Sequence, residues 1–146
     1  VGDIRSHPSG DLNAQYRSIP DLAHNFVLQA VFEGSPCARE EIEEKLEDAR
    51  AKRRLSQPSG ASAGCIFKNP EEIPAGKLID ELGLKNACVG DACVSSVHAN
   101  FIINRGHARA RDITNLLDMI RTAAMASRGI DLKSEAQVIG DREPQF

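Results

Sequence analysis

The sequence predicts an α+β fold, with a mixed or antiparallel sheet and helices packed on one side of it. Short segments rich in β-branched and aromatic residues alternate with segments whose apolar residues recur at helical spacing, and no internal repeat is present. The chain has 146 residues, of which 41% are apolar. This length suits one domain with its own core and is short for two.

The first expected strand covers residues 26–32, which are mostly apolar. A helix is expected to follow, because Ser35 is a typical N-cap residue and Pro36 suits the first helical position. Cationic side chains gather at residues 50–54, where a helix dipole favours them near its end. The helix is therefore expected to end near Leu55.

Residues 57–64 are rich in Pro, Gly and Ser and predict a loop, followed by a short strand at residues 65–68. Pro74 is expected to open a compact helix over residues 75–82, which Gly83 closes.

Residues 87–94 are expected to be extended, and residues 98–104 are expected to form a buried strand because three large apolar residues are contiguous there. Asp112 is expected to cap a long amphipathic helix that ends near Gly129. Residues 135–140 are expected to form a last extended segment.

The composition argues against nucleic-acid and membrane partners. Aromatic residues make up 4% of the chain and Trp is absent, so a stacking platform for single strands is not expected. A net charge of -3 gives no field that would attract a polyanion. No apolar run approaches the roughly 20 residues of a membrane-spanning helix. We expect a soluble protein.

The four cysteines are expected to be reduced thiols, three of them buried as small hydrophobic residues. No C-x-x-C pair is present, so a structural zinc site is weakly supported and no metal is expected. A disulfide between Cys88 and Cys93 is conceivable. A thiol metal site made by Cys65, these two cysteines and His98 is the least favoured alternative.

Three features are candidates for chemistry. Cys65 follows the small residues Ser-Ala-Gly, which allow a ligand to come close, although a buried inert thiol has the same pattern. Glu135 stands just before the last expected strand, where a surface position is the commoner case. Basic residues that could bind phosphate or carboxylate, or simply be solvated, are Arg17, Arg53, Arg54, Lys68 and Lys77.

Seven segments carry a more specific signal: YRS (16–18), KRRLSQP (52–58), SAGCIFKNP (62–70), AGKLIDELGLK (75–85), VGDACVSSVHANFIIN (89–104), ARDI (110–113) and GIDLKSEAQVIG (129–140). Together they resemble the carboxy-terminal part of UDP-N-acetylenolpyruvoylglucosamine reductase, the MurB family. The resemblance covers nearly all of residues 16–140, in the family's order and close to its spacing.

The resemblance implies an FAD-dependent oxidoreductase that uses NADPH to reduce UDP-N-acetylglucosamine enolpyruvate to UDP-N-acetylmuramate, in cytoplasmic peptidoglycan synthesis. It also implies that residues 1–34 are the tail of a preceding FAD-binding domain and that residues 35–146 form the carboxy-terminal substrate-binding domain. The fragment alone would then lack FAD and redox activity, and the chain's start at Val1 is expected to reflect a cut in a longer protein.

The resemblance also implies roles for individual residues. Cys65 stands where the family usually has a serine and would be the proton donor, and a thiol, with an ordinary pKa of about 8.5, is a better acid than an alcohol. Glu135 matches the family's active-site glutamate, which helps to stabilise an enolic intermediate. The substrate-binding residues would be Tyr16, Arg17, Arg53, Asn69 and Lys77.

Several positions depart from the family's pattern, among them Asp91, the pair Ser96 and Val97, and the pair Ala136 and Gln137. The last pair replaces the usual Val-Arg and removes a cation next to Glu135. We read Asp91 and the pair Ser96 and Val97 as surface variation. The cysteine at position 65 keeps an alternative open: a UDP-sugar-binding module without catalytic activity.

Overall fold

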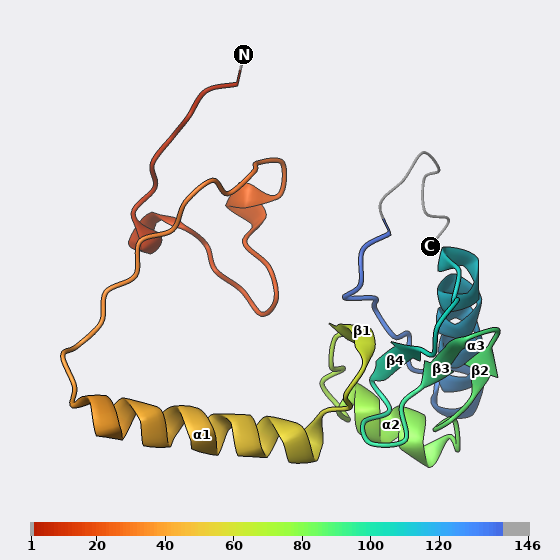
Figure 1. The fold of residues 1–146 in the computed structure, drawn as a ribbon. Helices are drawn as coiled ribbons and strands as arrows, with labels where there is room; N and C mark the ends of the chain where they lie inside the picture. Colours follow the sequence, from red (N-terminus) through yellow and green to blue (C-terminus); the bar gives the residue numbers. More distant parts are fainter. Residues whose placement is uncertain (1, 139–146) are drawn as a thin grey trace. The chain divides into compact units, whose positions relative to one another are not determined.

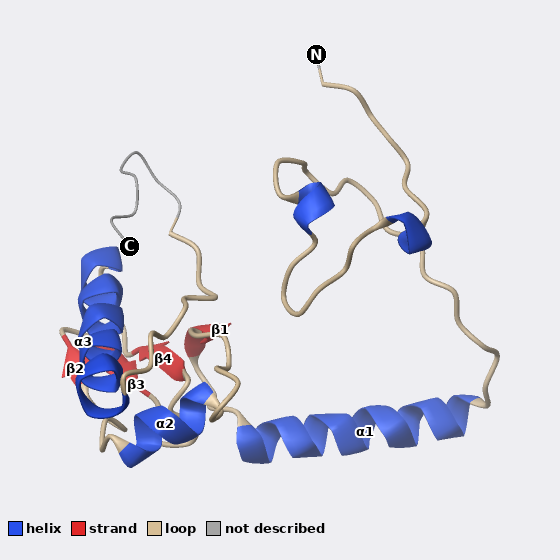
Figure 2. Cartoon of the chain, turned by 180° about the vertical axis from the view of Figure 1, so that it is seen from behind, coloured by secondary structure: helices blue, strands red, loops and turns tan. Residues whose placement is uncertain are grey.

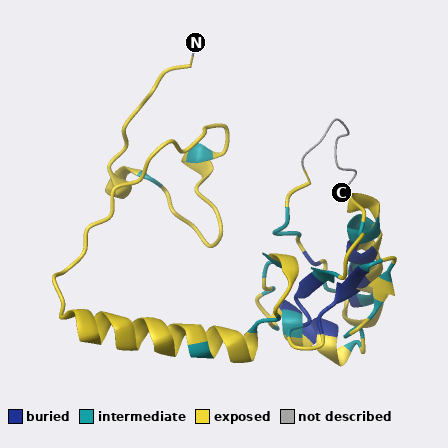
Figure 3. Cartoon of the chain, viewed as in Figure 1, coloured by how far each residue is buried: buried dark blue, intermediate teal, exposed yellow. Residues whose placement is uncertain are grey.

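The computed structural model describes residues 2–138, in two units, Val1–Ala38 and Arg39–Phe146. The first unit contains two single turns of 3₁₀-helix, Ser9–Asp11 and Pro20–Leu22. The strand expected at residues 26–32 is absent, so that prediction was wrong. Phe26 and Phe32 are 94% and 90% exposed. Figure 3 shows nearly all of the first unit in the colour of exposed residues. A segment with high β propensity needs a partner strand, and the described part of this unit offers none.

Helix α1 spans Arg39–Ser56 and is the first element of the second unit (Figure 1). It ends close to the predicted residue, but its expected start at Ser35 and Pro36 was wrong. None of its residues is buried, and ion pairs line its surface, such as Arg39 with Glu43 at 2.8 Å. Since such pairs stabilise an exposed helix and the stretch 35–38 has no charged residue, helix formation begins at Arg39.

Four antiparallel strands form one sheet in the order β1-β4-β3-β2, which confirms the predicted α+β class. The strands are β1 (Ala61–Cys65), β2 (Cys88–Val89), β3 (Ala92–Val94) and β4 (Phe101–Asn104). The extended segment expected at residues 87–94 is confirmed as a hairpin of β2 and β3. Of the strand expected at residues 98–104, only the second half forms.

The first strand of the sheet lies earlier in the chain than predicted. Strand β1 ends at Cys65, so both the loop expected over residues 57–64 and the strand expected at residues 65–68 were partly wrong. Ser62 pairs with Ile103 and Cys65 with Phe101, with a register shift between them. Gly64 has a φ of +83° at this shift, a conformation that glycine adopts readily. The small residues therefore form the irregular strand itself.

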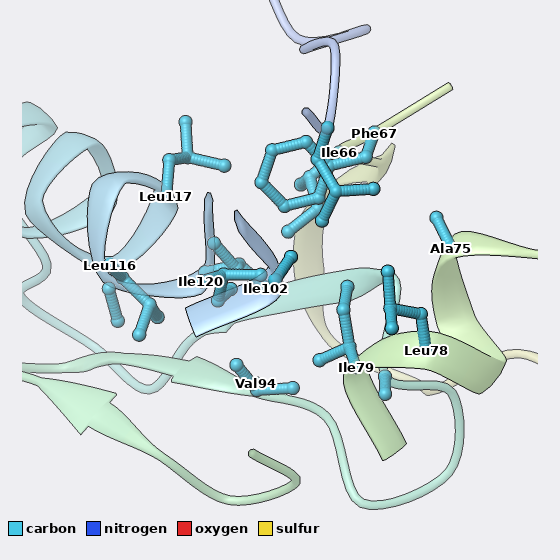
Figure 4. Close-up of a cluster of buried hydrophobic side chains, with 14 residues drawn as sticks. Ile66, Phe67, Ala75, Leu78, Ile79, Val94, Ile102, Leu116, Leu117 and Ile120 are labelled. Atoms are coloured by element: carbon cyan, nitrogen blue, oxygen red, sulfur yellow. The ribbon is translucent and has the colours of Figure 1, made fainter. Parts of the chain in front are cut away.

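Two helices cover one face of the sheet and enclose the core (Figures 2 and 4). Helix α2 spans Ala75–Glu81 and α3 spans Ala110–Arg128. The buried side chains that meet between the helices and the sheet include Leu78, Ile79, Val94, Ile102, Leu116, Leu117 and Ile120. Burial of this apolar surface is the main stabilising contribution to the unit.

The ends of α2 and α3 agree with the sequence at three of four points. Pro74 precedes α2, Gly83 follows it with a φ of +71°, and Gly129 ends α3 with a φ of +67°. The expectation that Asp112 is the N-cap of α3 was wrong, because Arg109 takes that position. The Asp112 carboxylate accepts a hydrogen bond from the Arg109 N–H at 2.9 Å, so it caps the helix from inside its first turn.

The last expected strand does not form in the described residues. Ser134 makes a single bridge with Phe67, and residues 135–138 are not in a strand. Residues 139 and 140, the rest of that prediction, lie outside the described residues. None of the helices in the described part of the chain has the length and apolar character needed to cross a membrane.

Candidate functional site

Cys65 stands at the last position of β1, at the point where the strand passes into the core. Its side chain is half-buried, and the next two residues, Ile66 and Phe67, are each 1% exposed. Figure 4 shows both of these side chains directed into the core. The two buried side chains fix the backbone immediately after Cys65, so the thiol is carried by a rigid segment.

Backbone hydrogen bonds bring Glu135 next to the segment that follows Cys65. The Glu135 N–H donates to the carbonyl of Ile66 at 2.8 Å, and the Lys68 N–H donates to the carbonyl of Lys133 at 2.9 Å. Two stretches, 66–68 and 133–135, therefore lie side by side although they are far apart in the sequence. The two residues predicted to be catalytic thus come from adjacent backbone segments.

Asn69 and Lys77 flank the start of α2. The Asn69 side-chain carbonyl accepts a hydrogen bond from the Ala75 N–H at 3.0 Å, which satisfies one of the free donors of the first helical turn. Lys77 is exposed one turn into the helix, with its ammonium 3.9 Å from the carboxylate of Glu81. Asn69 therefore retains its amide N–H groups for other contacts, while its carbonyl closes the loop that precedes α2.

Tyr16 and Arg17 belong to the first unit, whereas Cys65 and Glu135 belong to the second. They occupy a tight turn closed by pairing of Gln15 with Ser18, and Arg17 has a φ of +57°. The Arg17 guanidinium carbon lies 5.8 Å from the centre of the Tyr16 ring, which is cation–π distance. These two predicted substrate-binding residues therefore act as one local pair.

Arg53 is exposed in the last turn of α1, and its neighbour Arg54 is engaged within the same helix. The Arg54 guanidinium lies 2.5 Å from the Glu47 carboxylate. This hydrogen bond and the charge of Arg54, with a smaller contribution from Arg50, hold the pKa of the Glu47 carboxyl below its usual value. Of the two adjacent arginines, Arg53 is therefore the better candidate for an outside anion.

The cysteines depart from the prediction. Cys88 and Cys93 form a disulfide, so the expectation that they are reduced was wrong. They face each other across the β2–β3 hairpin with Cα atoms 4.1 Å apart, which brings the two sulfur atoms within bonding reach. Cys37 and Cys88 are exposed and Cys65 is half-buried, so the expected burial of three cysteines was also wrong. No group of three or more His, Cys, Asp or Glu residues in the described chain is arranged to hold a metal ion.

One buried polar residue of this region, Asn100, was not predicted from the sequence; it is 2% exposed. Its side-chain amide forms two hydrogen bonds with the backbone of Phe67, at 3.0 Å and 2.8 Å. The available signal was an asparagine next to three contiguous large apolar residues, because a buried amide requires specific partners. His98, expected to be structural, accepts a hydrogen bond from the Asn100 N–H at 3.1 Å.

A separate depression of about 220 Å³ is lined by residues of β3, β4 and nearby loops, among them Ser95, Ile103 and Arg105. It contains none of the residues that the sequence predicted for the site. The Ser95 hydroxyl oxygen already accepts hydrogen bonds from the N–H groups of Val97 and His98.

Known proteins of one kind match this sequence and fold. The family model described as UDP-N-acetylenolpyruvoylglucosamine reductase, C-terminal domain, matches residues 56–139. The reductase of that name from Chlamydia felis is 41% identical over 98% of this chain and 48% of its own length. That from Heliobacterium modesticaldum is 48% identical over 70% of this chain and 33% of its own length.

A solved structure agrees with these matches. The crystal structure of the reductase (MurB) from Thermus caldophilus aligns with a TM-score of 0.61 and 40% identity, over 70% of this chain and 36% of that one. The chain thus spans less than half the length of each of these proteins. Fold and sequence together define the carboxy-terminal domain of a reductase. The chain belongs to the MurB family, as the C-terminal domain of UDP-N-acetylenolpyruvoylglucosamine reductase.

Proposed function

We propose that this chain acts as the substrate-binding and proton-donating part of a reductase that converts UDP-N-acetylglucosamine enolpyruvate to UDP-N-acetylmuramate. NADPH would be the reductant, FAD the cofactor, and cytoplasmic peptidoglycan synthesis the setting. Residues 1–34 would be the tail of an FAD-binding domain, and residues 35–146 the substrate-binding domain. The observation that carries the proposal is the 2.8 Å hydrogen bond from Glu135 to Ile66, because it brings the second candidate residue beside Cys65.

We assign no residue of this chain to the flavin. The depression near Ser95 holds about 220 Å³, less than the roughly 300–1,000 Å³ of typical small-molecule sites. The sequence also lacks the G-x-G-x-x-G motif of dinucleotide-binding turns. A preceding domain would hold the flavin, which would supply a hydride to the substrate.

Cys65 would supply the proton that completes the reduction. Once the terminal carbon of the enolpyruvyl group has gained a hydride, the carbon bonded to the ether oxygen needs a proton. A thiol is still mostly protonated at neutral pH, so it can act as this acid. Its position on a rigid segment favours a fixed direction of transfer.

Glu135 and the cationic residues would handle the negative charge. Glu135 would stabilise the enolic form of the substrate carboxylate by sharing a proton with it. Arg53, Arg17 and Lys77 would bind the diphosphate or the carboxylate, since guanidinium and ammonium groups donate charge-assisted hydrogen bonds to such oxygens. Tyr16 and Asn69 would add hydrogen bonds that orient the sugar nucleotide.

Substitution of Cys65 in a complete reductase that contains this chain tests the proposal. Cys65→Ala should lower kcat by about 10² to 10⁴-fold, the usual contribution of a general acid, with little change in KM. Cys65→Ser should retain much of the activity, because a hydroxyl can donate the same proton. Cys37→Ser, a change at an exposed cysteine of the first unit, serves as the control. Unchanged turnover in Cys65→Ala would instead favour the non-catalytic UDP-sugar-binding module.

A further inference from the structure

The side chain of Asn100 takes the place of a missing strand beside Phe67. Phe67 and Ser134 face each other in an antiparallel bridge, but its two hydrogen bonds are formed by the residues on either side of them. The N–H and C=O of Phe67 itself are therefore directed away from Ser134. On that side the Phe67 N–H donates to Asn100 Oδ1 at 3.0 Å, and Asn100 Nδ2 donates to the Phe67 carbonyl at 2.8 Å. A primary amide offers the same donor and acceptor as a peptide group.

The backbone of Asn100 continues the same ladder. The last pair between β1 and β4 joins Cys65 to Phe101, and the next bond runs from the Ile66 N–H to the Asn100 carbonyl at 3.0 Å. Asn100 therefore forms three hydrogen bonds with the two residues that follow Cys65. The other edge of this short segment accepts the Glu135 N–H. Asn100 thus fixes the short segment that directly follows Cys65 and to which the backbone of Glu135 is hydrogen-bonded.

The backbone of Asn100 is itself held by His98, which packs against α2. The Asn100 N–H donates to His98 Nδ1, and the rings of His98 and Phe101 pack in a T-shaped arrangement with their centres 5.1 Å apart. The same imidazole packs on Gly76 of α2, where an added Cβ would lie 2.8 Å from His98 Cε1. Substitution of Gly76 therefore disturbs Asn100 from outside the segment.

We propose that Asn100 is a positioning residue for the reductase reaction: its amide sets the placement of Cys65 relative to Glu135 through the peptide groups of Ile66 and Phe67. This inference rests on the proposed function, because positioning matters only if those two residues act on substrate. Loss of the amide would leave two buried polar groups of Phe67 without partners and let the segment shift. A displacement of about 1 Å at reacting groups can lower the rate about 10²-fold.

The geometric part of the proposal can be measured on this chain without activity. Amide hydrogen exchange in Asn100→Leu should be at least tenfold faster at Phe67 and Glu135 than in the unchanged chain. The amide of Ile120 in the core reports global unfolding. Equal acceleration at all three amides would overturn the proposal, because it would indicate general destabilisation only.

The kinetic part uses the complete reductase and the nearly isosteric variant Asn100→Asp. An ionised aspartate can still accept from the Phe67 N–H but cannot donate to the Phe67 carbonyl, whereas a protonated one can do both. We expect kcat to fall by about 10 to 100-fold with KM changed less than threefold, and to recover partly as the pH is lowered. Gly76→Ala should lower kcat in the same sense by a smaller factor.

Asn104→Asp is the matched control, because Asn104 is the last residue of β4, the strand that directly follows Asn100, and its Oδ1 accepts from the N–H groups of Gly106 and Ala108. It should leave kcat and its pH profile unchanged. Full turnover of Asn100→Asp in a reductase that Cys65→Ala inactivates would overturn the positioning role alone. Full turnover of Cys65→Ala would contradict the proposed function itself.

Discussion

Two apolar stretches of this chain have similar composition, but one is exposed and irregular and the other is a strand of the sheet. Residues 26–32 contain two phenylalanines and several aliphatic residues. They are exposed and form no strand. Strand β4 (Phe101–Asn104) has the same kinds of residues, pairs with two neighbouring strands and contributes Ile102 to the buried core. The difference shows that β propensity alone does not make a strand, because pairing and coverage of its apolar face are also needed.

The largest expected effect comes from truncating a phenylalanine of the core, Phe67, compared with one of the exposed stretch, Phe32. Phe67→Ala should lower the free energy of unfolding by about 3 to 5 kcal/mol, because it empties a site that is 1% exposed. Phe32→Ala should change it by less than about 0.5 kcal/mol, as usual for surface positions. Urea denaturation of both variants measures the difference. A large loss in Phe32→Ala would mean that residues 26–32 are packed in solution.

A smaller effect is expected at the β2–β3 hairpin, which has only two residue pairs and a disulfide across one of them. Cys88→Ser should lower the free energy of unfolding by about 2 kcal/mol, the chain-entropy value for so short a loop. Cys37→Ser in the exposed unit should leave it unchanged. Treatment of the unchanged chain with a thiol reductant should reproduce the Cys88→Ser result. Stability that does not respond to reductant would contradict the disulfide.

The smallest expected effect is the pH dependence of α1, a helix without buried residues. The pKa of Glu47 is lowered by Arg54, so its contribution to the folded helix is present above the ordinary glutamate pKa of about 4.3 and is lost as the pH falls through the lowered value. Helix content measured by circular dichroism should decline slightly over that acidic range. Glu47→Gln should remove part of the decline, and an unaltered pH profile in that variant would show that the ion pair contributes nothing.

Local signals predicted the helices better than the strands. Pro74, Gly83 and Gly129 marked helix ends correctly, because their backbone preferences act without distant partners. The register of β1 could not be predicted, because its small residues have low β propensity and pair only through an irregular ladder with β4. The disulfide depended in the same way on the register of the β2–β3 hairpin.

In the candidate site, too, individual residues were predicted from the sequence, but their neighbours were not. Cys65 and Glu135 were predicted from motif resemblance, and Arg53, Asn69 and Lys77 with them, but no pattern in the sequence showed which segments would become neighbours. Asn100 was missed because its importance comes from the backbone groups that it pairs, and these are known only from the fold.

The sequence by itself determined the family, the α+β class, both ends of α2 and the end of α3, since each depends on residue types at short spacing or on motifs in order. The tertiary structure alone decided that the backbone of Glu135 lies beside that of Ile66, that Asn100 fills an incomplete ladder and that residues 26–32 remain unpaired. The physical reason is that buried peptide groups must find partners, and which partners they find depends on segments that are distant in the chain.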